Sequence, residues 1–256
     1  MASAPQANLP VFYKDLMPLN SRDHAGWRSR TTDRAPWLAE FHAVPLTVEE
    51  FPAAARHFPI IFSSGENPVP LALMGLNEGV NVFVDAEGQV TENIYIPAYV
   101  RRYPFLLAKL TPQTDELSLC FDPSSDLVGD FAEGNALFGG AQPSENTKAL
   151  LGFCEQFEQA GMKTQAFVEE LAKHKLLMDG EVAIQQEGVE APFVYRGFQM
   201  INQEVLQDIR GDVLRGWNQS GLLPLIYAHL FSLELIREIF GRQVQQGKGP
   251  VPAPAA

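Results

Sequence analysis

The hydrophobic period of the chain changes once, near Ser144, and this change limits the folds that the chain can adopt. Before Ser144, short apolar runs alternate with tight turns, a pattern typical of antiparallel strands. After it, apolar residues recur at the spacing of one helix face, as in Leu150, Phe153, Cys154 and Phe157. The sequence therefore predicts an α+β fold, with a mainly antiparallel sheet in the first half and helices packed from the second half.

The length of 256 residues suits one large domain or two small ones. We predict a single α+β domain over residues 9–242, with disordered tails at residues 1–8 and 243–256. A two-part layout that divides near residue 143 is the alternative, because the helical half begins there. The most apolar stretch, residues 222–235, predicts a last helix with two apolar faces, which we expect to be buried against the sheet.

Several local signals make predictions that a structure can test. Thr47 and Glu50 fit a capping box at the start of a helix. Residues 122–144 hold four glycines and few periodic apolar positions, which predicts a long, solvated acidic loop. Gly161 is expected to interrupt the first long helix. His229 lies on the main apolar stripe of the last helix, so we expect a hydrogen-bonded core histidine there.

Residues 95–105 hold two prolines around a predicted short helix and precede a predicted hairpin. Arg101 and Arg102 lie in this helix between Tyr99 and Tyr103. An arginine fork beside phenol groups can bind a carboxylate or a phosphate, so these four residues are the predicted ligand-binding site. The alternative is that the arginines pair with structural carboxylates while the tyrosines pack in the core. The side chains of adjacent helical residues point about 100° apart, so the two arginines cannot both face the same surface. We expect Arg101 to pair with a structural carboxylate and Arg102 to face outward.

The charge of the chain excludes several classes of partner. Lys and Arg number 19 and Asp and Glu 31, so the formal charge is 19 − 31 = −12. We therefore predict no binding to nucleic acid and no membrane insertion. Cys120 and Cys154 are too few for a disulfide scaffold and are predicted to be buried thiols. The first ten residues lack the features of a signal peptide, and the expected location is the cytoplasm.

Motifs for phosphate loops, nucleophile elbows and zinc proteases are missing from the sequence, which predicts no cofactor and leaves catalysis open. One weak metal pattern remains. Glu40 and His42 are predicted to share one face of a strand over residues 38–44, and His24 or His57 would complete a two-histidine, one-carboxylate site. The alternative function is therefore a metal-dependent enzyme of the non-heme iron type. The plainer interpretation is a half-exposed strand with its polar face in water.

Four segments together resemble the bacterial SapC-like family, and the likeness extends over about residues 9–240. These segments are residues 42–47, 50–62, 95–105 and 221–233. The resemblance provides no catalytic residues. It implies a non-catalytic accessory or binding protein with a protein or peptide partner, linked to surface-layer systems or to the handling of an imported peptide or compound. A structural part in a surface layer is a further possibility that the family name suggests.

Overall fold

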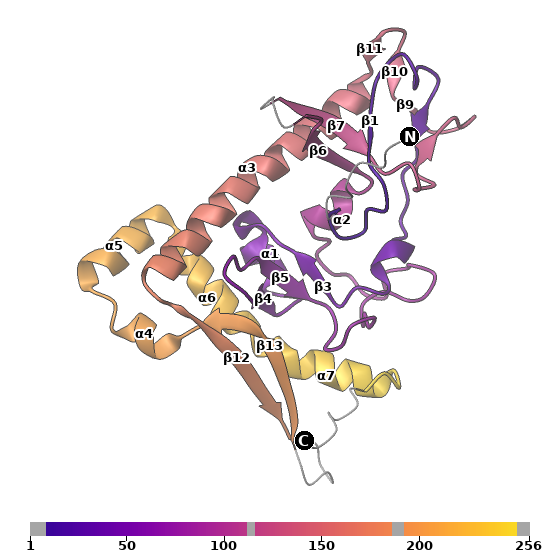
Figure 1. Cartoon of the computed structure of the whole chain (residues 1–256). Coiled ribbons are helices and arrows are strands. Elements are labelled where there is room, and N and C mark those ends of the chain that lie inside the picture. The colour runs from indigo at the N-terminus through magenta and orange to yellow at the C-terminus, as the bar shows by residue number, and fades with distance from the viewer. Residues whose placement is uncertain (1–8, 112–115, 186–191, 250–256) are drawn as a thin grey trace. The chain divides into compact units, whose positions relative to one another are not determined.

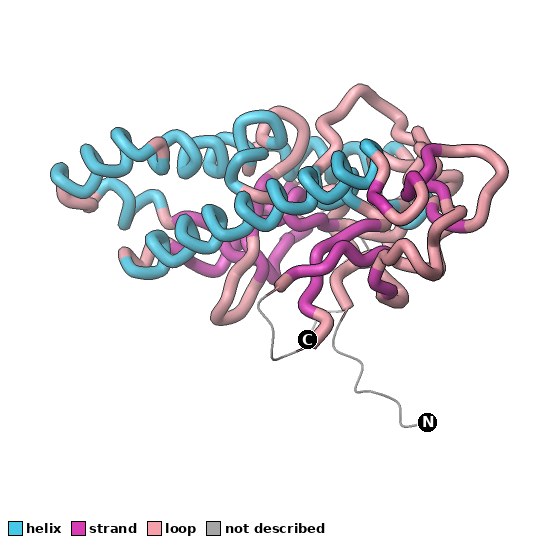
Figure 2. The backbone as a smooth tube through the Cα atoms, turned by 90° about the horizontal axis from the view of Figure 1, so that it is seen from above, coloured by secondary structure: helices cyan, strands magenta, loops and turns pink. Residues whose placement is uncertain are grey.

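The computed structural model describes residues 9–111, 116–185 and 192–249 (Figure 1). The backbone contains both helices and strands (Figure 2). The strands pair antiparallel, and most helices lie in the second half of the chain. The predicted α+β class is therefore confirmed. The predicted tail at residues 1–8 lies outside the described residues.

The chain divides into two compact units, and each unit joins two stretches of sequence. The first unit consists of Met1–Arg34 and Val100–Gln159, and the second of Ala35–Tyr99 and Ala160–Ala256. One division falls between Arg34 and Ala35, and the other two fall inside helix α2 (Ala98–Arg102) and helix α3 (Glu145–Lys173). A single domain over residues 9–242 stays a prediction, to which the Discussion returns.

The second unit contains a five-stranded sheet in the order β12-β13-β4-β5-β3, and all neighbouring strands are antiparallel. Its strands are β3 (Ala43–Pro45), β4 (Ile60–Ser63), β5 (Pro70–Leu73), β12 (Leu177–Ile184) and β13 (Phe193–Ile201). Aromatic rings join this sheet to α3, because Phe167 lies edge-on to Phe51 and stacks near Phe62. These buried rings form part of the core of the unit.

The helices of the second unit come mostly from the end of the chain. They are the 3-10 helices η1 (Pro36–Leu38) and η2 (Val48–Glu50), and the helices α1 (Phe51–Ala54), α4 (Gln203–Gln207), α5 (Gly211–Ser220), α6 (Leu222–Ser232) and α7 (Leu235–Gln245). The predicted last helix is thus two helices. The predicted disordered tail from Gln243 is wrong for residues 243–249, since Gln243 is buried and its side-chain carbonyl accepts from the backbone N–H of Leu76 at 2.6 Å.

The first unit is built from small antiparallel sheets and the first part of α3. One sheet has the order β1-β7-β6 and another the order β8-β2-β9, while β10 pairs with β11. The strands are β1 (Met17–Pro18), β2 (Arg28–Ser29), β6 (Phe105–Lys109), β7 (Leu117–Phe121), β8 (Val128–Gly129), β9 (Asn135–Ala136), β10 (Phe138–Gly139) and β11 (Gln142–Pro143). The pairing of β6 with β7 confirms the predicted hairpin.

Two sequence predictions, one for residues 122–144 and one for Gly161, are wrong. Residues 122–144 are not a simple solvated loop, because they contain four short strands and supply Val128, Leu137 and Phe138 to the core of the first unit. Strands of two residues are too short to show a period in the sequence. Gly161 does not interrupt α3, which is continuous over 29 residues. A glycine in a helix costs only about 1 kcal/mol, which the packing of a long helix can outweigh.

No helix in the part of the chain that the structure describes combines the length and the apolar character that a bilayer crossing requires.

Candidate functional site

The two arginines of the predicted ligand site have the opposite orientation to the one expected. Arg102 is only 7% exposed, its Nη1 lies 3.5 Å from Oε1 of Glu158, and its guanidinium lies 4.2 Å from the ring centroid of Phe157. Arg101 is the exposed member, with its guanidinium 5.3 Å from the ring centroid of Phe153. The prediction was wrong because the partners of both arginines come from α3. Which arginine faces α3 depends on tertiary packing, which the local sequence does not show.

The two tyrosines of the predicted site also differ in their burial. Tyr99 is buried and belongs to the second unit, whereas Tyr103 is half-buried and lies edge-on to Tyr13 at 5.2 Å between ring centroids. Burial, followed by the negative charge of Asp122, raises the pKa of Tyr103 above its ordinary value. Arg102 also lies over Tyr13, at 5.9 Å, so the structure brings Arg102 and Tyr103 to one ring. Ligand binding by Tyr99, Arg101, Arg102 and Tyr103 stays a prediction.

Glu50 is the residue that fixes the segment before α2, and only half of its role is visible in the sequence. Its Oε2 accepts from the backbone N–H and the hydroxyl of Thr47, both at 2.9 Å, which confirms the capping box. Its Oε1 accepts from the hydroxyl of Tyr95 at 3.0 Å and from the backbone N–H of Ala98 at 2.6 Å. These four bonds satisfy a buried carboxylate. No local pattern links Glu50 to partners so distant in sequence.

The structure does not place Glu40 and His42 on one strand face. Glu40 is exposed in the turn that follows η1, and His42 precedes β3. Of the predicted strand over residues 38–44, only Ala43 and Val44 are in a strand. Burial lowers the pKa of His42, and the charge of Glu78 partly opposes this. Over residues 9–111, 116–185 and 192–249, no three His, Cys, Asp or Glu side chains form a group that could hold a metal ion.

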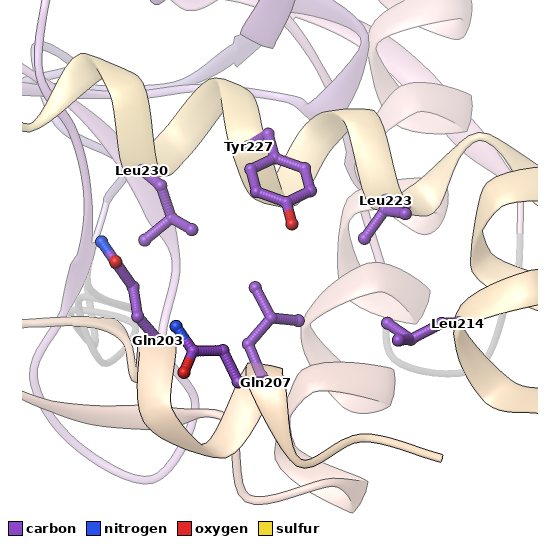
Figure 3. A pocket seen from close by; sticks show the side chains of 7 residues that line it. Gln203, Gln207, Leu214, Leu223, Tyr227 and Leu230 are labelled. Carbon is purple, nitrogen blue, oxygen red and sulfur yellow. The ribbon is translucent and has the colours of Figure 1, made fainter. Parts of the chain in front are cut away.

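The second unit has a groove between α4, α5 and α6 that the sequence did not predict. Its volume is about 200 Å³, and we call it the α6 groove. It is lined by Gln203, Leu206, Gln207, Leu214, Leu223, Tyr227 and Leu230. In Figure 3 the tyrosine and two of the leucines extend from α6, and the two glutamines face them from α4. The groove thus combines leucine side chains with two side-chain amides.

The inner face of α6 is attached to the sheet by His229 and Ser232. The backbone N–H of Ile201 donates to Nε2 of His229 at 3.1 Å, so Nδ1 carries the proton and donates to the carbonyl of Ile60 at 2.8 Å. The hydroxyl of Ser232 accepts from the N–H of Ile60 at 2.8 Å. Burial lowers the pKa of His229 to about 4, against a weaker opposing effect of the bond to Ile60. The predicted core histidine is confirmed.

The outer face of α6 is exposed, which corrects the expectation that both apolar faces are buried. Leu223, Tyr227 and Phe231 follow one another at a spacing of four residues along this face. Tyr227 is 43% exposed and Phe231 is 74% exposed, and their rings stack with centroids 5.8 Å apart. Phe231 is the most exposed large apolar side chain in the described part of the chain. We call these three residues the α6 ridge.

A second hollow of about 450 Å³ lies against α3, η2 and the start of α6. Its lining includes Phe167, Leu222 and Leu225, together with Lys163 and Glu49. Lys163 Nζ donates to Glu49 Oε1 at 2.5 Å. An ion pair already occupies the polar edge of this hollow, whereas the lining of the α6 groove includes no Asp, Glu, Lys, Arg or His. An uncharged partner group therefore displaces no ion pair when it enters the α6 groove.

Comparisons with known proteins give one match. No curated protein and no solved structure matches the chain significantly. The family model described as SapC matches residues 19–239, which is most of the 256-residue chain and includes the whole of the α6 groove. The chain therefore belongs to the SapC family.

Proposed function

We propose that this SapC-family protein is a non-catalytic accessory or binding protein whose partner is a protein or peptide. The observation that carries the proposal is the α6 groove with the exposed α6 ridge beside it. Small-molecule sites usually enclose about 300–1,000 Å³. The volume of the α6 groove, about 200 Å³, suits an apolar side chain better than a cofactor.

The chemistry of the groove supports the same proposal. Leucines on three helices provide an apolar surface, and the amides of Gln203 and Gln207 each offer a donor and an acceptor. Amides at the edge of an apolar groove can pair with the backbone of a partner while one of its side chains fills the groove. Exposed aromatic residues such as Tyr227 and Phe231 are also the type that contributes most at protein interfaces.

Capture of partners from the native host tests this proposal. The baits are the parent chain, Gln207→Lys, which adds a charge at the groove edge, and Tyr227→Ala, which removes its aromatic wall. Met162→Lys is the matched control, because Met162 is 66% exposed on α3 and does not line the groove. We expect both groove variants to lose a partner that the parent and the control retain. Equal recovery with all four baits would contradict the proposal.

A second contact, with an acidic ligand, remains part of the proposal at the sequence-predicted site. Arg102 is turned towards Glu158, so Arg101, which is exposed over Phe153, is the better candidate for this contact. Arg101→Ala should weaken capture of an acidic partner without unfolding the protein. A partner retained in full by this variant would assign binding to the α6 groove alone.

We also propose that the protein acts in the cytoplasm. Fractionation of the native host should place the protein in the cytosol. Recovery from the envelope would overturn this location and would favour the surface-layer possibility.

A further inference from the structure

The α6 ridge and the α6 groove are adjacent on the same helix, which suggests the identity of one occupant. We propose that two copies of this chain pair through α6, with Phe231 of each copy seated in the α6 groove of the other. The inference rests on the proposed function of the groove as a site for an apolar protein side chain. It adds the identity of the protein that supplies the side chain.

The spacing of the ridge residues defines the register of the pair. Tyr227 is at the centre of the α6 ridge, with Leu223 four residues before it and Phe231 four residues after it. In a two-fold pair, a contact of one residue with a second is repeated with the roles exchanged. If the axis passes beside Tyr227 and the two α6 helices are antiparallel, Phe231 of each copy faces Leu223 of the other. Leu223 lines the α6 groove, so one symmetry operation fills both grooves.

The local charge also favours a second copy at this face. Helix α6 has no Asp, Glu, Lys or Arg over its 11 residues. Residues 203–231 contain two arginines and three acidic residues, so their formal charge is 2 − 3 = −1. The whole chain has a charge of −12, which generally opposes self-association. Electrostatic repulsion between copies is therefore weak where the α6 helices would meet.

The size of the helix sets the expected strength of the pair. A helix of 11 residues is about 16 Å long at about 1.5 Å per residue. Stable interfaces usually bury about 800 Å² on each partner, more than a pair of such short helices is expected to provide. We therefore expect a weak dimer whose dissociation constant is on the order of micromolar.

Sedimentation equilibrium of the purified full chain over micromolar concentrations tests the dimer. The parent should shift from monomer to dimer as concentration rises. Phe231→Ser should weaken the dimer at least tenfold, and because this side chain is 74% exposed the variant should still fold. Met162→Ser, at an apolar position on α3 that is 66% exposed, should behave as the parent does. A parent that stays monomeric, or a dimer that Phe231→Ser leaves unchanged, overturns the inference.

A disulfide trap tests the register. Both native cysteines, Cys120 and Cys154, are buried, so an introduced surface thiol is the accessible one. Tyr227→Cys should give a disulfide-linked dimer under mild oxidation, because the two introduced thiols meet at the axis and the covalent bond retains a pair that loss of the tyrosine ring weakens. Met162→Cys should stay monomeric. Equal yields from the two variants overturn the register. A dimer that fails these tests, alongside a host partner that the groove variants still lose, leaves the proposed function intact.

Discussion

Replacement of His229 by glutamine should change how the stability of the protein depends on pH. Burial lowers the pKa of His229 from 6.5 to about 4 in the folded chain. Below pH 6.5 the imidazole is therefore protonated in the unfolded chain, whereas in the folded chain it stays neutral down to about pH 4. The contribution to stability is complete above pH 6.5 and is lost as pH falls towards 4. At about 1.4 kcal/mol per unit of pKa, the loss is about 3 kcal/mol.

Urea unfolding of the parent and of His229→Gln between pH 7.5 and pH 4 measures this effect. The difference in unfolding free energy between the two proteins should shrink by about 3 kcal/mol over this range, since glutamine does not titrate. Ser232→Ala is the matched control, because it removes a hydrogen bond to the same residue, Ile60, without removing a titrating group. Its difference from the parent should not depend on pH. A pH-independent difference for His229→Gln as well would refute the reasoning.

Three further predictions concern the packing of the chain. Arg102→Ala should lower the unfolding free energy by about 2 kcal/mol. This is less than for a fully buried ion pair, because Glu158 is half-exposed. Arg101→Ala should change it by less than about 1 kcal/mol, and thermal melts of both variants measure the difference. Gly180→Ala should destabilise the folded protein by about 1–3 kcal/mol, because the added Cβ would lie 2.2 Å from the buried ring of Phe198. Gly161→Ala in α3 should stabilise it by about 0.5–1 kcal/mol, because the added Cβ meets open space. Urea unfolding measures both changes. If the two units form one domain, limited proteolysis should release no stable fragment that lacks residues 221–240.

The features that the sequence predicted correctly depend on local patterns. The β6–β7 hairpin has two apolar runs separated by a short connection. Thr47 shows its capping role within four residues, because Glu50 accepts from its backbone N–H and its hydroxyl. His229 was assigned to the core because it lies on the main apolar stripe of its helix. In each case the signal and its partner lie within a few residues, or the helical period alone decides.

The features that the sequence did not predict depend on residues far apart in the chain. The orientation of Arg101 and Arg102 depends on α3, and the second half of the Glu50 hydrogen-bond set comes from Tyr95 and Ala98. A helix that is apolar on two faces does not reveal which face is left exposed. Tyr227 and Phe231, on the second apolar face of the predicted last helix, were the one signal of the α6 groove, and their interpretation as core followed from the usual burial of such helices.

Site-specific photo-crosslinking from the edge of the α6 groove is the most direct test of the claim that this groove binds protein. The photoreactive residue p-benzoylphenylalanine replaces Gln207 in the chain produced in its native host, and Met162 in the control. Irradiation should give a discrete adduct from the Gln207 position, either with a second copy or with another protein, and none from the Met162 position. The absence of any adduct specific to the Gln207 position would contradict the claim.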